Sequence, residues 1–233
     1  GLGDVYKRQT PRMTRVETLV ISGDPDRWRS LGLTVTDDGL IPLFGTSLRI
    51  VAPTPRDDAA DDEPQARRAL GEEPRGVIAW ELSGTAAHTP DVVDGLPTTS
   101  VEPGRPVFAD HDLGAVGLDH LVVLTGDLDR TSTAIAAATG CELKRIRDLG
   151  SMRQGFHRIG GGGLIVEIVE RPEVEDDDAS FWGVVINVDD LDAACELLGD
   201  DIGAPKDAVQ PGRRIATVRD EVGLGLPVAL MTP

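Results

Sequence analysis

The chain has 233 residues, and its 40 Asp and Glu against 23 Lys and Arg give a formal net charge of −17 at pH 7. Such an acidic surface repels phosphate backbones, so no nucleic acid partner is expected. The apolar runs are far shorter than the roughly 20 residues of a membrane-spanning helix, so no membrane partner is expected either. The two cysteines, Cys141 and Cys195, lack ligand-like spacing, which indicates reduced packing residues in a cytoplasmic protein.

The first residues differ from the rest of the chain. Residues 1–12 contain the only Tyr and one of the three Lys of an otherwise Arg-rich sequence. The run Asp4-Val5-Tyr6-Lys7-Arg8-Gln9 resembles the translation of an adaptor used in sequencing libraries. We therefore interpret residues 1–12 as a non-native leader and Met13 as the start of the native chain.

The first part of the chain predicts a compressed unit of strands with one helix. No helix is expected at 89–99, because Pro90, Gly95 and Pro97 interrupt that stretch. The pattern of apolar and turn-forming residues predicts the other elements: a strand at 16–22, a short helix around Trp28, strands up to Val51, a Pro-, Asp- and Ala-rich linker at 56–75, and a strand at 76–83.

The second part of the chain predicts two successive βαβββ modules. In the first module, Asp127 is a suitable N-cap for an Ala-rich helix at 131–139, which Gly140 ends. The same order then restarts after a charged linker at 173–178. The other elements are strands at 118–125, 142–148, 152–159 and 164–170 in the first module, and a strand at 182–188, a helix at 191–198 and strands at 214–219 and 226–231 in the second.

Three short segments recur in the same order in both parts of the chain. Their offset is nearly constant at about 105 residues, which indicates a duplicated unit. Two domains are therefore expected, at 13–112 and 117–233. The matching pairs are GDPDR at 23–27 with GDLDR at 126–130, GVI at 76–78 with GVV at 183–185, and VEPGR at 101–105 with VQPGR at 209–213.

The module pattern resembles that of the vicinal oxygen chelate superfamily. The resemblance is carried by LDHLVV at 118–123 as an opening strand and LIVE at 164–167 as a closing strand. It covers 117–233 directly and 13–112 through the internal repeat, which makes the first copy a degenerate glyoxalase-like domain. The superfamily includes glyoxalases, extradiol dioxygenases, epimerases, fosfomycin-modifying enzymes and metal-free, bleomycin-binding resistance proteins. The resemblance implies an α+β fold of tandem paired βαβββ modules whose cupped mixed sheets enclose a pocket.

The superfamily takes metal ligands from the first and fourth strands of two facing modules. By resemblance, His120 falls at the first-strand position and Glu167 at the fourth-strand position of one module. The partner module has Gly183 at the first position and no carboxylate in its closing strand at 228–231. Catalytic ions normally use about three protein ligands. The resemblance therefore implies an incomplete metal site, where a divalent ion is doubtful and the cofactor is unknown.

Three further residues bear on this site. Glu17 in the first copy aligns with His120, but the strand at 47–51 offers no acid to accompany it. His111 or His157 would complete the ligand set if the fold brought either one close to the pair.

His120 and Glu167 each have a structural and a functional interpretation. His120 lies in an apolar strand, so it is either hydrogen-bonded core or a ligand, general base or substrate-binding group near pH 7. Glu167 lies between Ile165 and Val169 on its strand face, where a carboxylate is costly unless an Arg pairs with it or a site uses it. We identify Glu167 as the first candidate catalytic residue, with His120 assisting it.

Four further side chains are candidates for binding a substrate. One strand places Gln154 and Phe156 on one face and His157 on the other, and Phe156 favours the first face as the pocket side because a ring needs cover. Arg213 would clamp an anion through paired hydrogen bonds, or belong only to a turn that the fold requires. Trp182 would either line the pocket or join the aromatic core.

These features predict a glyoxalase- or dioxygenase-like protein that binds and transforms a small oxygenated metabolite. Lyase or isomerase chemistry is expected rather than oxygen chemistry, because an oxygen-activating iron needs more ligands. The alternative is a non-catalytic protein of the same fold that binds or sequesters a small molecule, and a structural interaction module is a third interpretation. The fold does not separate these functions. Because duplication supplies module pairing within one chain, a monomer is expected.

Overall fold

The computed structural model describes residues 13–53, 75–85, 89–160, 163–171 and 178–233, which form two mixed β-sheets and a few helices. The predicted leader at 1–12 and nearly all of the two predicted linkers lie outside the described residues. Within the described part of the chain, no helix has the length and apolar character needed to cross a membrane.

The larger sheet is formed by two βαβββ modules that follow one another in the chain. The first consists of β7 (Ala115–Thr125), α3 (Leu128–Thr139), β8 (Leu143–Asp148), β9 (Arg153–Arg158) and β10 (Ile165–Glu170). The second consists of β11 (Ser180–Val188), α4 (Leu191–Leu198), β12 (Lys206–Asp207), β13 (Arg214–Thr217) and β14 (Val228–Met231). The strand order is β12-β13-β14-β11-β7-β10-β9-β8.

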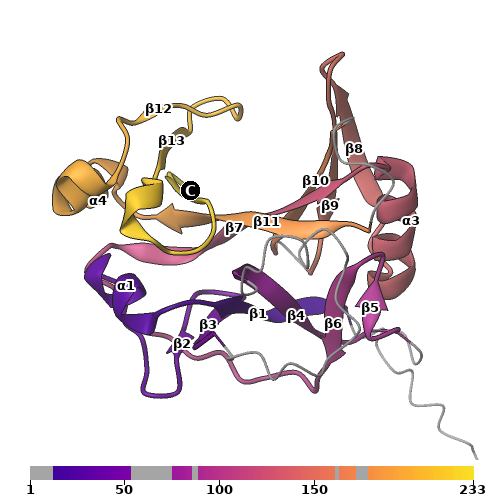
Figure 1. Cartoon of the computed structure of the whole chain (residues 1–233), viewed down its shortest axis with the longest axis horizontal. Coiled ribbons are helices and arrows are strands. Elements are labelled where there is room, and N and C mark those ends of the chain that lie inside the picture. Colours follow the sequence, from indigo (N-terminus) through magenta and orange to yellow (C-terminus); the bar gives the residue numbers. More distant parts are fainter. Residues whose placement is uncertain (1–12, 54–74, 86–88, 161–162, 172–177) are drawn as a thin grey trace, which may run out of the picture.

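This sheet curves into a trough (Figure 1). β7 and β11 run antiparallel at its middle, and in each module the first strand pairs in parallel with the last. β8 and β9 rise as one wall, and β12 and β13 form the opposite wall. Because side chains alternate along a strand, each central strand presents one face to the trough and the other to its outer side.

The smaller sheet repeats the same pairing with shorter modules. Its elements are β1 (Arg15–Ser22), α1 (Pro25–Ser30), β2 (Leu40–Ile41), β3 (Ser47–Val51), β4 (Gly76–Ser83), β5 (Val92–Val93) and β6 (Leu96–Ser100). The strand order is β2-β3-β1-β4-β6-β5, with β1 parallel to β3, β4 parallel to β6, and β1 antiparallel to β4.

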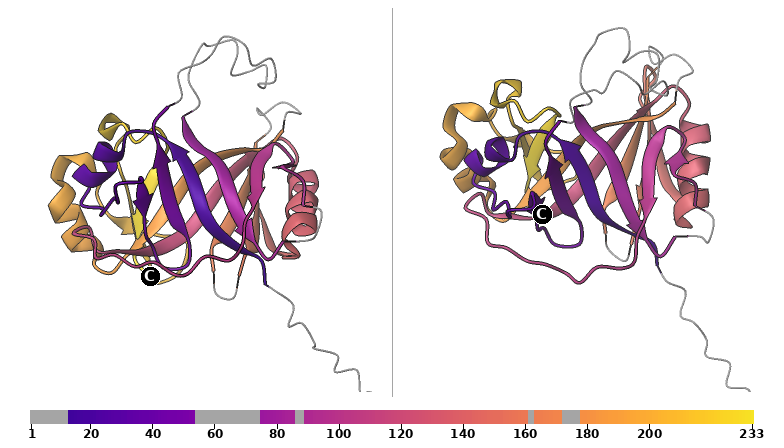
Figure 2. Two further views of the ribbon diagram at one scale, coloured as in Figure 1. Left: turned by 90° about the horizontal axis from the view of Figure 1, so that it is seen from below. Right: turned by 60° about the horizontal axis from the view of Figure 1, so that its bottom comes forward.

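The smaller sheet covers the outer side of the larger one (Figure 2). β4 contacts β11, and the rings of Trp80 and Phe181 meet edge to face with their centroids 5.6 Å apart. A continuous buried apolar cluster includes residues of both sheets. The outer side of β7 and β11 is therefore largely covered, although a cavity of about 580 Å³ remains between the sheets near Glu17 and Gly117. The trough is the face of the larger sheet that the smaller one leaves open.

The α+β class with cupped mixed sheets is confirmed, and the predicted elements differ from the observed ones mainly at their ends. α3 begins three residues earlier than expected, because the Asp127 side chain accepts a hydrogen bond from Arg130 N at 2.9 Å and caps Leu128 as the first helical residue. α3 ends as predicted at Gly140, which has a φ of +67°.

A buried carboxylate joins the smaller sheet to α3. Asp94 lies in the β5–β6 turn with a φ of +48°, and its side chain accepts hydrogen bonds from Arg130 Nε at 2.7 Å and Thr131 Oγ1 at 2.5 Å. Its backbone oxygen accepts another from Ala179 N at 2.9 Å, just before β11. One turn thus fixes the positions of both α3 and β11.

We expect Asp94→Ala to lower the free energy of unfolding by about 2 kcal/mol, because it removes a buried acceptor from Arg130 and Thr131. Chemical denaturation measures this change. Asp91→Ala, an exposed acid in the same segment, is the matched control and should cost less than about 0.5 kcal/mol. Equal losses in the two variants would contradict the role assigned to Asp94.

Candidate functional site

A cavity of about 1000 Å³ opens in the trough of the larger sheet. His120 of β7, Ile165 and Glu167 of β10 and Val185 of β11 form its floor. One wall comes from β8 and β9, and the other from residues 206–211 with parts of β13 and β14. The wall residues are Lys144, Arg145, Arg147, Gln154, Phe156, His157 and Arg158 on one side, and Lys206, Asp207, Ala208, Val209, Gln210, Pro211, Ile215 and Met231 on the other.

The parallel register of β7 and β10 brings His120 and Glu167 together. His120 pairs with Ile165 and Val122 pairs with Glu167, so the two polar side chains lie on adjacent strands two positions apart. Residues two positions apart on a strand share a face. Both side chains therefore belong to the trough face, with an imidazole and a carboxylate as the polar groups of an otherwise apolar floor.

A β-bulge brings the side chain of Asp119 close to that of His120. Consecutive residues of a regular strand, such as these two of β7, would point to opposite faces of the sheet. Leu118 pairs with Ile186 and His120 with Val185, so Asp119 has no partner in β11. A bulge twists the strand and disturbs the usual alternation of side chains. Nδ1 of His120 consequently lies 2.5 Å from Oδ2 of Asp119, as an electrostatic contact rather than an aligned hydrogen bond.

Arg213 and Asn187 hold Asp119 from its other side. Arg213 Nη2 donates hydrogen bonds to Asp119 Oδ1 at 2.6 Å and to Asn187 Oδ1 at 2.7 Å. Asn187 Nδ2 donates to the same Asp119 oxygen at 3.0 Å, and Arg213 Nε donates to Thr232 O at 2.7 Å. The network therefore connects β7, β11 and the end of the chain behind the cavity floor.

This network keeps Asp119 ionised. Burial alone would raise the pKa of its carboxyl, but the contacts with His120, Arg213 and Asn187 outweigh burial and hold the pKa well below its usual range. The ionised Asp119 carboxylate faces Nδ1 of His120. Nε2 of His120, which has no hydrogen-bond partner among the described residues, then remains available on the cavity side.

Glu167 has the opposite electrostatic environment. Burial raises the pKa of its carboxyl, and the positive charges of His120 and Arg147 offset only part of this effect. Its Oε1 accepts a hydrogen bond from Gln154 Nε2 at 2.8 Å. The Gln154 Oε1 atom is buried without a partner in the described chain. The floor thus holds a carboxyl group that is prone to take up a proton, beside an amide oxygen with unused acceptor capacity.

The structure separates the four predicted substrate-binding residues into two groups. Gln154 and Phe156 line the cavity, on the strand face that the sequence favoured. Arg213 is not a lining residue, because its guanidinium is used in the network with Asp119, which differs from the expected anion clamp. Trp182 is 42% exposed, lies outside the lining and has the Arg171 guanidinium 6.0 Å from its ring centroid.

His111 and His157, the two histidines that the sequence offered to complete the ligand set, do not join His120 and Glu167. His111 accepts a hydrogen bond from Thr34 N through Nδ1 at 3.0 Å, and its Nε2 lies 2.8 Å from Pro42 O. The His157 ring contacts Ser132 Oγ and Cys141 O, each at 2.9 Å, and burial lowers its pKa. Both rings are occupied by structural contacts.

The residues of the floor do not fit a tightly held metal ion. In the ranges that the structure describes, no three His, Cys, Asp or Glu side chains gather in a way that could hold one. His120 and Glu167 offer one nitrogen and one carboxylate, whereas catalytic ions normally use about three protein ligands. We therefore derive no catalytic step through a metal.

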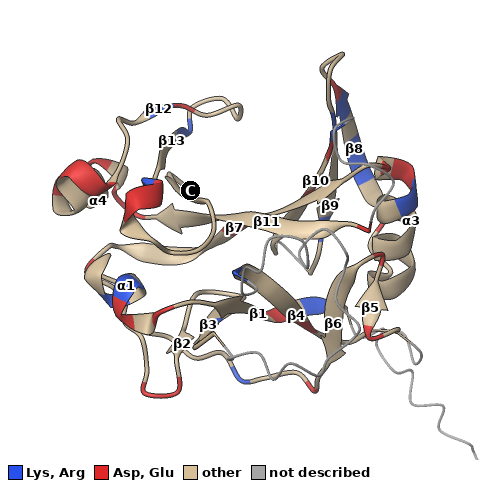
Figure 3. Ribbon diagram, in the orientation of Figure 1, with Lys and Arg blue, Asp and Glu red and all other residues tan. Residues whose placement is uncertain are grey.

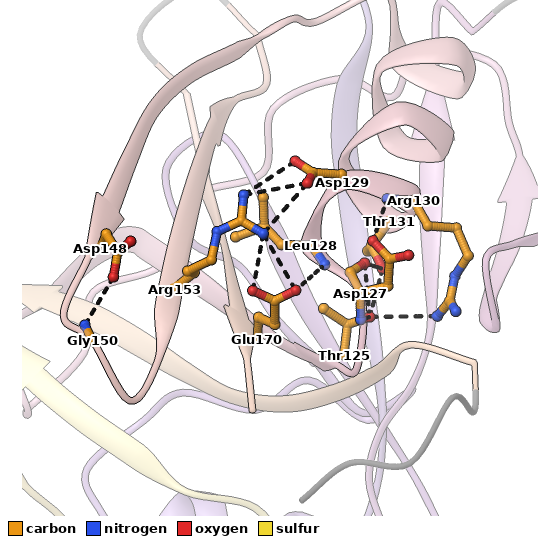
Figure 4. A network of polar contacts seen from close by, with 10 residues as sticks. All are labelled: Thr125, Asp127, Leu128, Asp129, Arg130, Thr131, Asp148, Gly150, Arg153 and Glu170. Carbon is orange, nitrogen blue, oxygen red and sulfur yellow. Dashed lines mark hydrogen bonds and ion pairs between the residues drawn. The ribbon is translucent and has the colours of Figure 1, made fainter. Parts of the chain in front are cut away.

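A second carboxylate of β10 has a purely structural environment (Figure 4). Glu170 accepts a hydrogen bond from Leu128 N at 3.2 Å, at the start of α3, and pairs with Arg153 at 3.1 Å. Arg153 also contacts Asp129 at 3.3 Å. Glu170 is thus a natural control for Glu167, because the same strand carries both carboxylates in different environments.

Sequence reasoning missed Asp119 and Asn187. The bulge that turns Asp119 toward His120 has no Gly or Pro within residues 118–120 to signal it. The Asp119–Arg213 contact joins residues 94 positions apart. The adjacency of an acid to His120 in the chain was the one available hint.

Comparisons with known proteins support the fold. A mutant of 4-hydroxymandelate synthase from Streptomyces coelicolor has a TM-score of 0.62 and 15% identity, covering 95% of this chain and 92% of that one. Methylmalonyl-CoA epimerase from Mycobacterium tuberculosis has a TM-score of 0.43 and 17% identity, covering 52% and 89%. The Streptomyces coelicolor epimerase with 2-nitronate-propionyl-CoA has 0.41 and 21%, covering 49% and 95%. No family model and no curated protein sequence matches the chain.

The first of these structures spans nearly the whole chain, so both sheets share the fold of that protein, in agreement with the cupped mixed sheets that the sequence predicted. At 15% identity, this similarity concerns the fold.

We expect Arg213→Met to lower the free energy of unfolding by about 3 kcal/mol at pH 6, because it leaves a buried carboxylate without its cation. The low pKa of Asp119 means that this stabilisation is present above the ordinary value of 3.8 and is lost as the pH falls below it. The difference between variant and wild type should therefore shrink by pH 3.5. Urea denaturation at both pH values measures it.

Arg214→Met is the matched control, because Arg214 forms an exposed ion pair with Asp192. Solvent screens such an exposed pair, so the loss of stability in Arg214→Met should be much smaller than in Arg213→Met. A pH-independent loss in Arg213→Met, or the same loss in both variants, would refute the electrostatic role of Arg213.

Proposed function

We propose that this protein is an enzyme that transforms a small oxygenated metabolite by proton transfer, as a lyase or isomerase of the glyoxalase- and dioxygenase-like fold. Glu167 is the base, and His120 assists it. The proposal is carried by the environment of Glu167. Its carboxyl group lies in the apolar floor of a large cavity, and burial there raises the pKa of that carboxyl group. A carboxyl with a raised pKa is suited to general acid–base catalysis near neutral pH.

The proposed chemistry requires only protein groups. The Glu167 carboxylate accepts a proton from a carbon next to a substrate carbonyl, and the C–H electron pair moves toward the carbonyl oxygen. His120 lines the cavity, and in its doubly protonated form, with Nδ1 facing Asp119, its Nε2–H would donate a hydrogen bond to that developing oxyanion. In a hydroxy-carbonyl substrate, delivery of this proton from Glu167 to the former carbonyl carbon, with transfer of the neighbouring hydroxyl proton to the oxyanion, gives an isomerase. Departure of a leaving group from the carbon next to the carbanion gives a lyase.

Gln154 and Phe156 are the proposed substrate-binding residues. Gln154 holds Glu167 through its amide nitrogen. Its Oε1 atom is buried without a partner in the described chain, and after a small movement of the side chain it would accept a hydrogen bond from a substrate hydroxyl. Phe156 supplies apolar contact beside them. A substrate with both a hydroxyl or carbonyl group and an apolar part is therefore favoured.

We expect any divalent metal to bind weakly, with His120 and Glu167 as its protein ligands and solvent as the remainder. Metal analysis and titration of the wild type and of Glu167→Ala measure this. Stoichiometric metal that is lost in Glu167→Ala would contradict the weak-site expectation.

The second candidate function is non-catalytic binding or sequestration of a small molecule in the same cavity. The incomplete set of metal ligands among the described residues favours this second function. In that case the cavity would bind a small molecule without the metal ion that a complete ligand set would hold. In either case we propose a monomer, because two paired modules already form the larger sheet within one chain. Two free thiols, Cys141 and Cys195, accord with the proposed reducing, cytoplasmic location.

Hydrogen–deuterium exchange tests the proposed reaction. The wild type is incubated in D₂O with a panel of hydroxy and keto acids, and loss of the proton next to the carbonyl is followed by NMR. We expect exchange of at least one acid to be slowed at least about 100-fold in Glu167→Gln, but to be little changed in Glu170→Gln. Saturable binding without exchange in the wild type would favour the non-catalytic function.

Glu167→Gln is also expected to be more stable than the wild type above pH 6. Because burial raises the Glu167 pKa above its ordinary value of 4.5, the folded state binds the proton more tightly than the unfolded state, and the wild type loses stability as the pH rises through this window. The gain should vanish at pH 4, where both states are protonated. Melting temperatures at pH 4, 6 and 8 measure it; a pH-independent difference would contradict the burial effect.

A further inference from the structure

We propose that the substrate carries a multiply charged oxyanion group, a phosphate or a carboxylate cluster, that cations from both walls bind at the mouth of the cavity. This inference deepens the proposed function and rests on it. The oxygenated, reacting part of the molecule then lies on the floor, beside Glu167 and His120.

The lining of the cavity contrasts with the composition of the chain. The protein has a net charge of −17, yet five cations and two acids line this cavity. Two of the three lysines in the whole sequence are among them. The acids are Glu167 and Asp207, and the cations are Lys144, Arg145, Arg147, Arg158 and Lys206.

None of these five cations forms an ion pair with an acid of the described chain, in contrast to Arg130, Arg153, Arg213 and Arg214. Figure 3 shows Lys and Arg along β8 on one side of the trough and near β12 and β13 on the other. Unpaired like charges that converge on one cavity repel one another, and an anion between them would relieve that repulsion.

The backbone of β8 is shaped to turn its cations inward. Leu143 pairs with His157 and Arg145 with Phe156, so Lys144 is an extra residue in β8 and forms a bulge. A bulge disturbs the alternation of side chains, which allows the consecutive Lys144 and Arg145 both to line the cavity. Arg147 follows two positions later, on the same face as Arg145.

Protection of an exposed strand edge does not account for the whole set. β8 is an edge strand of the larger sheet, where Lys and Arg discourage pairing with other chains. However, Arg158 belongs to the interior strand β9, and Lys206 reaches the cavity from the opposite wall. A shared anionic ligand explains cations on both walls, and Arg is the side chain best suited to bidentate binding of phosphate or carboxylate.

The depth of these groups separates the two parts of the site. Lys144, Arg145 and Lys206 are exposed, whereas His120 is buried and Glu167 is half-buried. An anionic group held by the exposed cations would keep its charge partly hydrated and away from the Glu167 carboxylate. The cavity volume of about 1000 Å³ is large enough to hold a metabolite that spans both parts.

Calorimetric titration with inorganic pyrophosphate and with citrate, at low salt, tests the proposal on the full chain. We expect one saturable site per chain, weakened about tenfold or more in the double variant Arg145→Gln/Arg147→Gln, and weakened in Lys206→Gln on the opposite wall. Arg219→Gln, an exposed arginine away from the cavity, is the control and should bind like the wild type. Tighter pyrophosphate binding points to phosphate, and tighter citrate binding to carboxylates.

Equal binding by the wild type and both wall variants, or no binding of either probe, would overturn the proposal. The melting temperature of each variant shows that it is folded; Lys206→Gln and the double variant alter separate walls, so each checks the other. Glu167→Gln should bind the probes at least as well as the wild type, because it loses only a negative charge. Probe binding without proton exchange would reject the catalytic function alone, and proton exchange without probe binding would reject the anion site alone.

Discussion

The parallel register between β7 and β10 is the constraint on which the cavity floor depends. A slip of one residue would turn Glu167 to the outer side of the sheet and bring Ile168 or Val166 into the trough. Both of these residues are fully buried on the outer side, in the apolar cluster that continues into the smaller sheet. The register of the floor is therefore fixed by packing behind it, and a polar pair is maintained where apolar residues would pack more favourably.

Two carboxylates near this floor show that partners, rather than depth, determine protonation. Both Asp119 and Glu167 lose hydration on folding, which raises the pKa of each. Asp119 gains Arg213, Asn187 and the His120 ring at contact distance, and its pKa falls. Among the described residues, Glu167 accepts one hydrogen bond, from the neutral amide of Gln154, and burial raises its pKa. The same functional group, a carboxyl, therefore serves in two ways: Asp119 is a fixed anion behind His120, and Glu167 is a proton-accepting group beside it.

Much of the fold follows from local sequence signals, while the site follows only in part. Asp127 and Gly140 delimit a helix through their own chemistry, and strand alternation is enough to put Gln154 and Phe156 on one face. The role of Arg213 could not be predicted, because its partner Asp119 is 94 residues away and faces it only through a bulge. The sequence did not predict the cations of the walls for a similar reason. Lys144 and Lys206 are far apart in the chain, and they line one cavity only because the sheet curves.

The two sheets repeat one pairing scheme, but their dimensions give them different capacities. In the smaller sheet, β2 and β5 have only two residues each, whereas β8 and β9 of the larger sheet have six each. Glu17, which aligns with His120, is held by Ser83 Oγ at 2.5 Å. This sheet instead contributes Trp80 and other buried residues that cover the outer side of β7 and β11. The burial of that apolar surface contributes free energy that offsets the cost of keeping the Glu167 carboxylate half-buried in the floor of the cavity.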